Sequence, residues 1–159
     1  MNDNLQITTQ SPEESMDIAA VLAQFLQAGD VLTLEGDLGA GKTSFTKGLA
    51  RGLGVKRTVN SPTFTIIKEY QGTNLPLYHM DVYRLEDGGE DMGLEEYFDG
   101  EGVTVIEWPS MIEDELPPAR LQLSLRHLDD TKRQIRFTPI GERYITMCKE
   151  FFNDERVSH

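Results

Sequence analysis

Residues 36–43 read GDLGAGKT and form the segment of the chain whose residue types and spacing best fit a chemical role. Gly36, Gly41, Lys42 and Thr43 match every fixed position of the pattern G-x-x-x-x-G-K-[ST]. Glycines let backbone N–H groups close around phosphates, the lysine reaches the β- and γ-phosphates, and the hydroxyl ligates the bridging Mg²⁺. A simple tight turn would need neither the lysine nor the hydroxyl at these offsets. The segment therefore predicts a nucleoside triphosphate site.

A second carboxylate is expected near such a metal, at the end of a neighbouring apolar strand. Asp81 ends the run LYHMD and is predicted to hold Mg²⁺, directly or through water, opposite Thr43. The alternative is an aspartate that ends the strand and caps a turn. Arg84 is close enough in sequence to reach phosphate oxygens or to pair with Asp81, although a surface ion pair would also explain it. His79, in the middle of the run, is interpreted as a core or interface histidine.

Glu107 and Trp108 follow the continuous apolar run that starts at Val103. Such a run is typical of a buried parallel strand, which places Glu107 at the carboxyl edge of the sheet, where ligands bind in open α/β folds. Because burying an unpaired charge is costly, a carboxylate there suggests a role as a water-positioning base or as an outer ligand of the metal. Trp108 could cover the site or anchor a partner, or simply pack.

Two further segments allow a functional and a plain interpretation. Residues 60–65, NSPTFT, lie where related triphosphatases carry a switch segment, so Thr63 and Thr65 could sense the γ-phosphate. A Ser-Pro turn that starts a strand explains the same residues. Residues 86–101 contain eight acidic residues and no lysine or arginine. They form either a solvated face or a docking surface for a basic partner.

The elements that must position these residues follow from periodicity, capping and turn signals. Helices are expected at about 11–29, 44–53 and 142–152, with a short acidic helix near 94–98. Strands are expected at 31–34, 63–70, 75–82, 103–106, 121–125 and 134–137, the last two joined by a hairpin at 129–131. Strands interleaved with helices predict an α/β protein of the P-loop NTPase fold. Its central sheet would be mostly parallel, with one antiparallel section near the end, and flanked by helices.

Length and composition narrow the class of protein. The 159 residues, 38% hydrophobic and without repeats or linkers, are expected to form a single P-loop ATPase domain over 1–159. A net charge of −12 argues against direct, extensive nucleic-acid binding, although it leaves room for a local basic patch. Cys148 is the only cysteine, and neither a secretory pattern nor an apolar run of about 20 residues is present. We expect a cytoplasmic protein without membrane contact.

Missing motifs separate the subclasses of triphosphatase. Asp81 is followed by Val-Tyr-Arg rather than the D-x-x-G of small GTPases, and the guanine-reading N-K-x-D is absent. A small-molecule kinase would add an arginine-bearing lid and an acceptor region, for which little sequence remains. Such a kinase and a nucleotide-dependent interaction switch nevertheless stay open as alternatives.

Four ordered motifs closely resemble the TsaE (YjeE) family, bacterial ATPases that assist the synthesis of threonylcarbamoyladenosine in tRNA. They are GDLGAGKT at 36–43, NSPTFT at 60–65, YHMDVYR at 78–84 and IEW at 106–108. The resemblance extends from about Ser11 to the last helix. It implies a subunit that binds ATP and Mg²⁺, hydrolyses ATP poorly alone, and acts on the paired TsaD and TsaB proteins so that their transferase can turn over. The acidic chain would then meet tRNA only indirectly, through these partners.

The resemblance also implies roles for particular residues. Lys42, Asp81 and Glu107 would be catalytic, with Thr43, Asp81 and Glu107 around the metal. The implied nucleotide-binding set is Ser11, Asp37, Leu38, Gly39, Ala40, Gly41, Lys42, Thr43, Ser44 and Arg133. Ser44 stands where many members have threonine, which keeps a second hydroxyl. Switch or partner candidates are Thr63, Thr65, Arg84 and Trp108.

Overall fold

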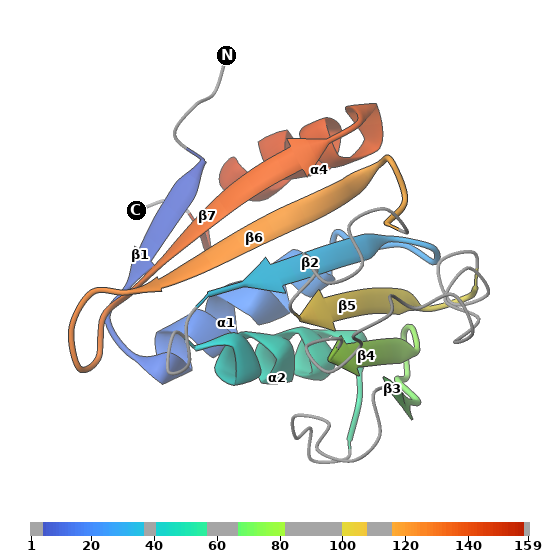
Figure 1. Ribbon diagram of the computed structural model, residues 1–159, viewed down its shortest axis with the longest axis horizontal. Helices are drawn as coiled ribbons and strands as arrows, with labels where there is room; N and C mark the ends of the chain where they lie inside the picture. Colours follow the sequence, from blue (N-terminus) through green and yellow to red (C-terminus); the bar gives the residue numbers. More distant parts are fainter. Residues whose placement is uncertain (1–4, 37–40, 57–66, 82–99, 108–115, 158–159) are drawn as a thin grey trace.

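The computed structural model describes residues 5–36, 41–56, 67–81, 100–107 and 116–157, apart from the side chain of residue 81. Figure 1 shows the elements along the chain. They are β1 (Gln6–Thr9), α1 (Pro12–Ala23), β2 (Val31–Glu35), α2 (Lys42–Leu53), β3 (Ile67–Tyr70), β4 (Leu77–Asp81), β5 (Val103–Glu107), β6 (Arg120–His127), β7 (Arg133–Ile140) and α4 (Glu142–Phe152). The expected acidic helix near 94–98 and the start of the strand expected at 63–70 lie outside the described residues.

The described strands form one seven-stranded sheet in the order β1-β7-β6-β2-β5-β4-β3 (Figure 1). The four central strands, β6, β2, β5 and β4, run parallel to one another. At one edge β3 runs antiparallel to β4, and at the other β7 and β1 continue antiparallel beyond β6. The expected α/β fold is confirmed. The antiparallel section expected near the end of the chain is β6 and β7, and a second antiparallel pair, β3 and β4, was not anticipated at the other edge.

Strand β1 was not anticipated from the sequence. Its four residues, QITT, are too few to show a clear alternation, and they are held by pairing with β7, where Ile7 lies opposite Ile135. The first helix begins as expected, with Ser11 as its N-cap and proline at its first position. It ends at Ala23 rather than near Gly29 because the chain tightens there: Phe25 N–H donates to the Leu22 carbonyl at 2.9 Å.

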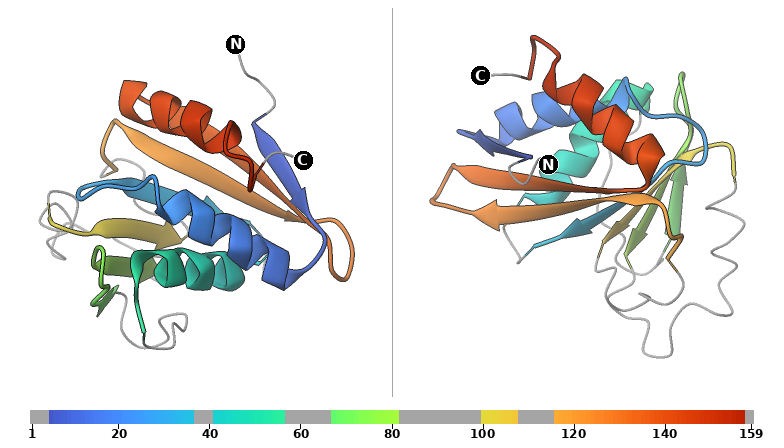
Figure 2. Two further views of the ribbon diagram at one scale, coloured as in Figure 1. Left: turned by 180° about the vertical axis from the view of Figure 1, so that it is seen from behind. Right: turned by 90° about the horizontal axis from the view of Figure 1, so that it is seen from above.

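The three described helices lie on the same face of the sheet (Figure 2). Alternate residues of the central strands, such as Leu32, Leu34 and Val105, point into the core beneath these helices. Thr104 and Ile106 point to the other face and are fully buried as well. Burial on both faces explains why the central strands appear in the sequence as continuous apolar runs. No helix among the described segments is long and apolar enough to cross a membrane.

Helices α1 and α2 pack backbone against backbone through two glycines of α2. A Cβ added at Gly48 would overlap the Met16 carbonyl oxygen, and one at Gly52 would lie 2.5 Å from the Ala20 carbonyl oxygen. Such distances leave no room for a side chain. The glycines therefore fix the position of α2, the helix whose first residues belong to the phosphate-binding motif.

Helix α4 anchors the beginning of β2, the strand that leads into the same motif. The Val31 N–H donates to the Tyr144 hydroxyl at 2.9 Å, and Arg143 pairs with Asp30 at 2.7 Å. Burial raises the pKa of Tyr144 above its usual value, so the hydroxyl stays neutral. The strand before the motif, β2, is thus anchored by α4, and the helix after it, α2, is fixed by its close packing on α1.

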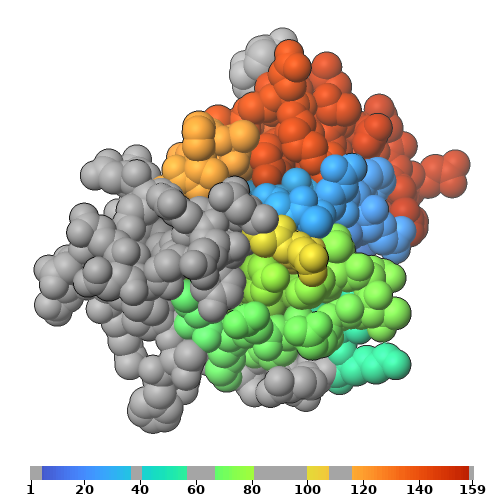
Figure 3. Space-filling model, turned by 90° about the vertical axis from the view of Figure 1, so that its right-hand side faces the viewer, coloured from blue at the N-terminus to red at the C-terminus, as the bar shows by residue number. Residues whose placement is uncertain are grey.

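The two edges of the parallel strands differ. Figure 3 faces the edge where these strands begin, and residues near 100 (yellow) lie there between those near 75 (green) and near 30 (blue). Backbone hydrogen bonds join these segments, from Gly29 N–H to Gly102 carbonyl at 3.0 Å and from Val103 N–H to Pro76 carbonyl at 2.9 Å. The phosphate-binding motif lies at the opposite edge, where the strands end.

Candidate nucleotide-binding site

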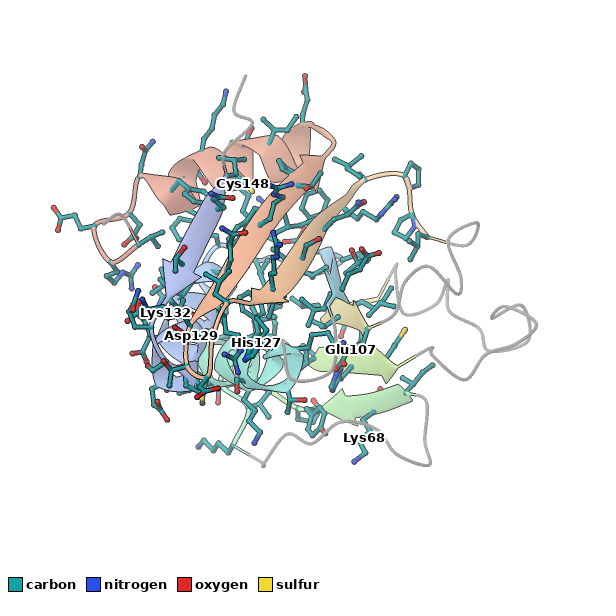
Figure 4. The ribbon with its side chains drawn as sticks, turned by 60° about the vertical axis from the view of Figure 1, so that its left-hand side comes forward. Lys68, Glu107, His127, Asp129, Lys132 and Cys148 are labelled. Atoms are coloured by element: carbon teal, nitrogen blue, oxygen red, sulfur yellow. The ribbon has the colours of Figure 1, made fainter. Side chains whose placement is uncertain are left out.

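The carboxyl ends of three parallel strands meet beside the phosphate-binding motif. Glu107 of β5 lies opposite Leu34 of β2 on one side and opposite Asp81 of β4 on the other. Figure 4 shows Glu107 at this end of its strand. Gly36 follows β2 directly, so the start of the motif and the backbone of both predicted carboxylate residues are brought together. The side chain of Asp81 lies outside the described residues.

Helix α2 begins at a glycine N-cap, which offers no side chain to cap the helix. Its N-cap, Gly41, has a left-handed backbone with φ of 97°, and no side chain caps the helix. The first N–H groups of a helix and the positive end of its dipole attract anions. Thr43 and Ser44 lie in this turn and are partly exposed. This end of α2 has the backbone geometry of a phosphate site.

The Lys42 side chain reaches back to the first residue of the motif, Gly36. Its ammonium donates to the Gly36 carbonyl, and only 7% of the residue is exposed. The Lys42 carbonyl accepts from the Thr46 hydroxyl at 3.0 Å, which holds the first turn in place. The charge is thus kept close to the backbone that would surround a phosphate group.

Glu107 is held by His79, a residue that the sequence analysis placed in the core without a role. His79 Nε2 lies 2.6 Å from Glu107 Oε2, with the two side chains 0% and 5% exposed. His79 pairs with Val105 in the sheet, so Glu107 is its diagonal neighbour two residues further along β5. The two-residue spacing of His79 and Asp81, which puts both on one face of a strand, was the signal that could have indicated this pair.

Arg133 lies against the start of α2. Its Cγ and Nε would be 3.7 Å from a Cβ added at Gly41. One guanidinium nitrogen, Nη1, donates to the Asp129 carbonyl at 3.0 Å, while Nε is buried and has no hydrogen-bond partner in the described part of the chain. Sheet pairing places Thr9 directly beside Arg133. An arginine implied by family resemblance alone is therefore brought to the motif from a distant part of the chain.

Of the remaining predicted residues, Ser11 caps a helix and the others lie outside the described part of the chain. The Ser11 hydroxyl accepts from the Glu14 N–H at 3.1 Å and so caps α1. Several predicted residues lie outside the described part of the chain: Asp37, Leu38, Gly39, Ala40, Thr63, Thr65, Arg84 and Trp108.

The donor set fits a nucleotide with its magnesium ion better than a metal bound by protein alone. Among the described residues no group of three or more His, Cys, Asp or Glu side chains could hold a metal ion. Mg²⁺ needs no such cage, because it is commonly held by one or two carboxylates, substrate phosphates and water. The uncapped start of α2, the Lys42 ammonium and the Thr43 hydroxyl supply the groups that a triphosphate would need.

The class of P-loop NTPase folds is defined by a β-strand, a glycine-rich motif and the N-terminus of a helix that follow one another at the carboxyl edge of a parallel sheet. Comparison with known proteins specifies the family. The model of the family "Threonylcarbamoyl adenosine biosynthesis protein TsaE" matches residues 9–135. The chain belongs to the TsaE family.

Relatives match over most of the chain. A protein of Bacillus subtilis strain 168, named tRNA threonylcarbamoyladenosine biosynthesis protein TsaE, is 56% identical over 155 residues, with 98% of each chain covered. A protein of the same name from Treponema pallidum is 43% identical over 133 residues, covering 82% of this chain and 98% of the relative. The crystal structure of YdiB from Bacillus subtilis superposes with a TM-score of 0.83 at 52% identity, with 93% of each chain covered.

Proposed function

We propose that this protein binds and hydrolyses ATP as an accessory factor of tRNA threonylcarbamoyladenosine synthesis, and that it acts on the TsaD–TsaB transferase complex to support its turnover. The relatives' names support the pathway. The observation that carries the hydrolytic role is the buried Glu107 carboxylate at the carboxyl end of β5, where the residue lies opposite Leu34 of the strand that leads into the phosphate-binding motif.

Each residue of the site has a proposed task. The N–H groups after Gly41, the Lys42 ammonium and the guanidinium of Arg133 bind and orient the phosphates. Thr43, Asp81 and Glu107 would hold Mg²⁺, directly or through water, and the ion would neutralise charge on the phosphates. Glu107 would also orient the attacking water and accept its proton.

The proposed dependence on partners follows from what the small acidic chain offers. With a net charge of −12, it is poorly suited to hold tRNA itself, so we assign the tRNA to the TsaD and TsaB proteins. Hydrolysis would be slow in isolation and stimulated in the complex. Thr63, Thr65, Arg84 and Trp108 are proposed as switch or partner residues, and the cytoplasm as the place of action.

Replacing Glu107 tests the hydrolytic role. The Glu107→Gln variant keeps the shape of the side chain and removes its charge and basicity, so we expect ATP to bind within about threefold of wild type while turnover in the complex falls at least tenfold, because a positioned base contributes about 10²–10⁴ in rate. Binding is measured with a fluorescent ATP analogue and turnover by phosphate release. Normal turnover by this variant would remove Glu107 from the mechanism.

A further inference from the structure

We propose that His79 is the positioning residue for Glu107: its Nε2–H holds one carboxylate oxygen, so that the other is presented to the attacking water. This inference rests on the proposed ATPase function and assigns a task to a residue that the nucleotide-binding motifs do not explain. His79 would not touch the nucleotide or the water. It would act through Glu107 alone.

The contact is close and shielded from solvent. Nε2 and Oε2 are 2.6 Å apart, and His79 is fully buried. Among the described residues, His79 provides the only hydrogen bond to the Glu107 carboxylate. A buried carboxylate without such a donor would be unfavourable and free to change its orientation. The histidine therefore selects one orientation of Glu107.

The two ring nitrogens of His79 have different surroundings. An ionised carboxylate only accepts hydrogen bonds, so Nε2 must carry the proton that it donates to Glu107. Nδ1 is buried without a hydrogen-bond partner in the described part of the chain. A ring that carries a proton on Nε2 fits this arrangement of the described residues.

The sheet makes the pair rigid. His79 and Asp81 are two residues apart on β4, and Glu107 faces Asp81 from β5 in parallel register. The hydrogen bond between His79 and Glu107 therefore crosses the diagonal between two strands that are already paired along their length. A carboxylate anchored in this way keeps its other oxygen in a fixed position at the carboxyl ends of the strands. Preorganisation of this kind is worth about 10- to 100-fold in activity where partners of active-site ligands have been removed.

Two substitutions at position 79 separate positioning from packing. His79→Gln offers an amide N–H near the place of Nε2, whereas His79→Leu fills similar space without a donor. We expect His79→Leu to lower kcat for ATP hydrolysis in the TsaD–TsaB complex about 10- to 100-fold, with ATP affinity within about threefold of wild type. His79→Gln should recover most of the lost rate. His127→Leu, at an exposed histidine at the end of β6, is the matched control and should behave as wild type.

A double-mutant cycle tests whether His79 acts through Glu107. If it does, His79→Leu should cost no further activity in a Glu107→Gln background, because the group that it positions is already gone. Independent, multiplicative losses would overturn the proposal while leaving the ATPase function intact. A wild-type complex that hydrolyses no ATP would overturn the ATPase function, and the proposal with it.

A measurement on the nucleotide-free protein needs no activity. Imidazole ¹⁵N spectra, with His79 assigned through the His79→Gln variant, should show a proton on Nε2, and the ring signals should shift in Glu107→Gln. A ring protonated at Nδ1, or signals unchanged by Glu107→Gln, would show that the two groups are not coupled and would overturn the proposal. Thermal melting of each variant shows whether it folds. If His79→Leu does not fold, His79→Gln is compared with wild type instead.

Discussion

Lys42 and Glu107 have opposite charges, and both are nearly buried, at 7% and 4% exposed. Each is held by a neighbour at the same edge of the sheet, Lys42 by the Gly36 carbonyl and Glu107 by His79. Buried charges of this kind are costly unless they are paired, and they cluster at functional sites. At the scale of single residues, the site is thus preorganised around the place where phosphate groups are proposed to bind.

Removing the Lys42 ammonium should abolish most nucleotide binding. A charge-assisted hydrogen bond is worth about 1.5–3 kcal/mol, so Lys42→Ala should weaken ATP affinity at least tenfold. Lys47→Ala, in the same helix, is the matched control because it removes an equal charge outside the phosphate-binding motif. Equilibrium titration with a fluorescent ATP analogue measures both. Equal affinities of the two variants would exclude Lys42 from the phosphate site.

At the scale of elements, two glycines decide where the phosphate-binding helix lies. Gly48 and Gly52 are four residues apart on α2 and let its backbone approach Met16 and Ala20 of α1. Glycine in a helix costs about 0.5–1 kcal/mol relative to alanine, and close packing of the two helices offsets that cost. The sequence alone carried no clear sign of this contact, because glycines inside a helix are usually only unfavourable.

A methyl group at position 48 should separate the two helices. Gly48→Ala would gain helix propensity and still lose stability, because the added carbon overlaps the Met16 carbonyl oxygen and lies 2.8 Å from the Ala19 Cβ. Overpacking typically costs about 1–3 kcal/mol, so we expect the melting temperature to fall by several degrees. Calorimetry of this variant and of Lys47→Ala as control measures the effect. A variant as stable as wild type would show that α1 and α2 move apart freely.

Local patterns in the sequence predicted most elements and missed what depends on pairing between distant segments. The capped first helix, the buried strand predicted at 103–106 and the last helix follow from periodicity and turn signals, and all three are observed. Strand β1 is held by β7, more than 120 residues later, and no local pattern encodes that pairing. His79 is buried, in keeping with the predicted core or interface position, but its partner Glu107 comes from another strand and could not be identified from a local pattern. The motifs indicate residues proposed for the chemistry and carry no signal for the neighbours that hold them.

At the scale of the whole molecule, the chain combines a site for an anion with a strongly acidic composition. The chain has twenty-seven acidic residues and only fifteen lysines and arginines. Two of these basic residues, Lys42 and Arg133, nevertheless lie at the start of α2. Positive charge is thus placed where a triphosphate is proposed to bind, while the net charge opposes binding of a long polyanion. This distribution fits a protein that handles ATP itself and leaves tRNA to its partners.

The most direct test of this account is the rate of ATP hydrolysis by the purified chain, measured alone and with the TsaD and TsaB proteins at saturating ATP and Mg²⁺. We expect a low rate for the chain alone, stimulation of at least about tenfold by the two partners together, and loss of that stimulation in Glu107→Gln. A chain that neither binds these partners nor hydrolyses ATP faster in their presence would contradict the account.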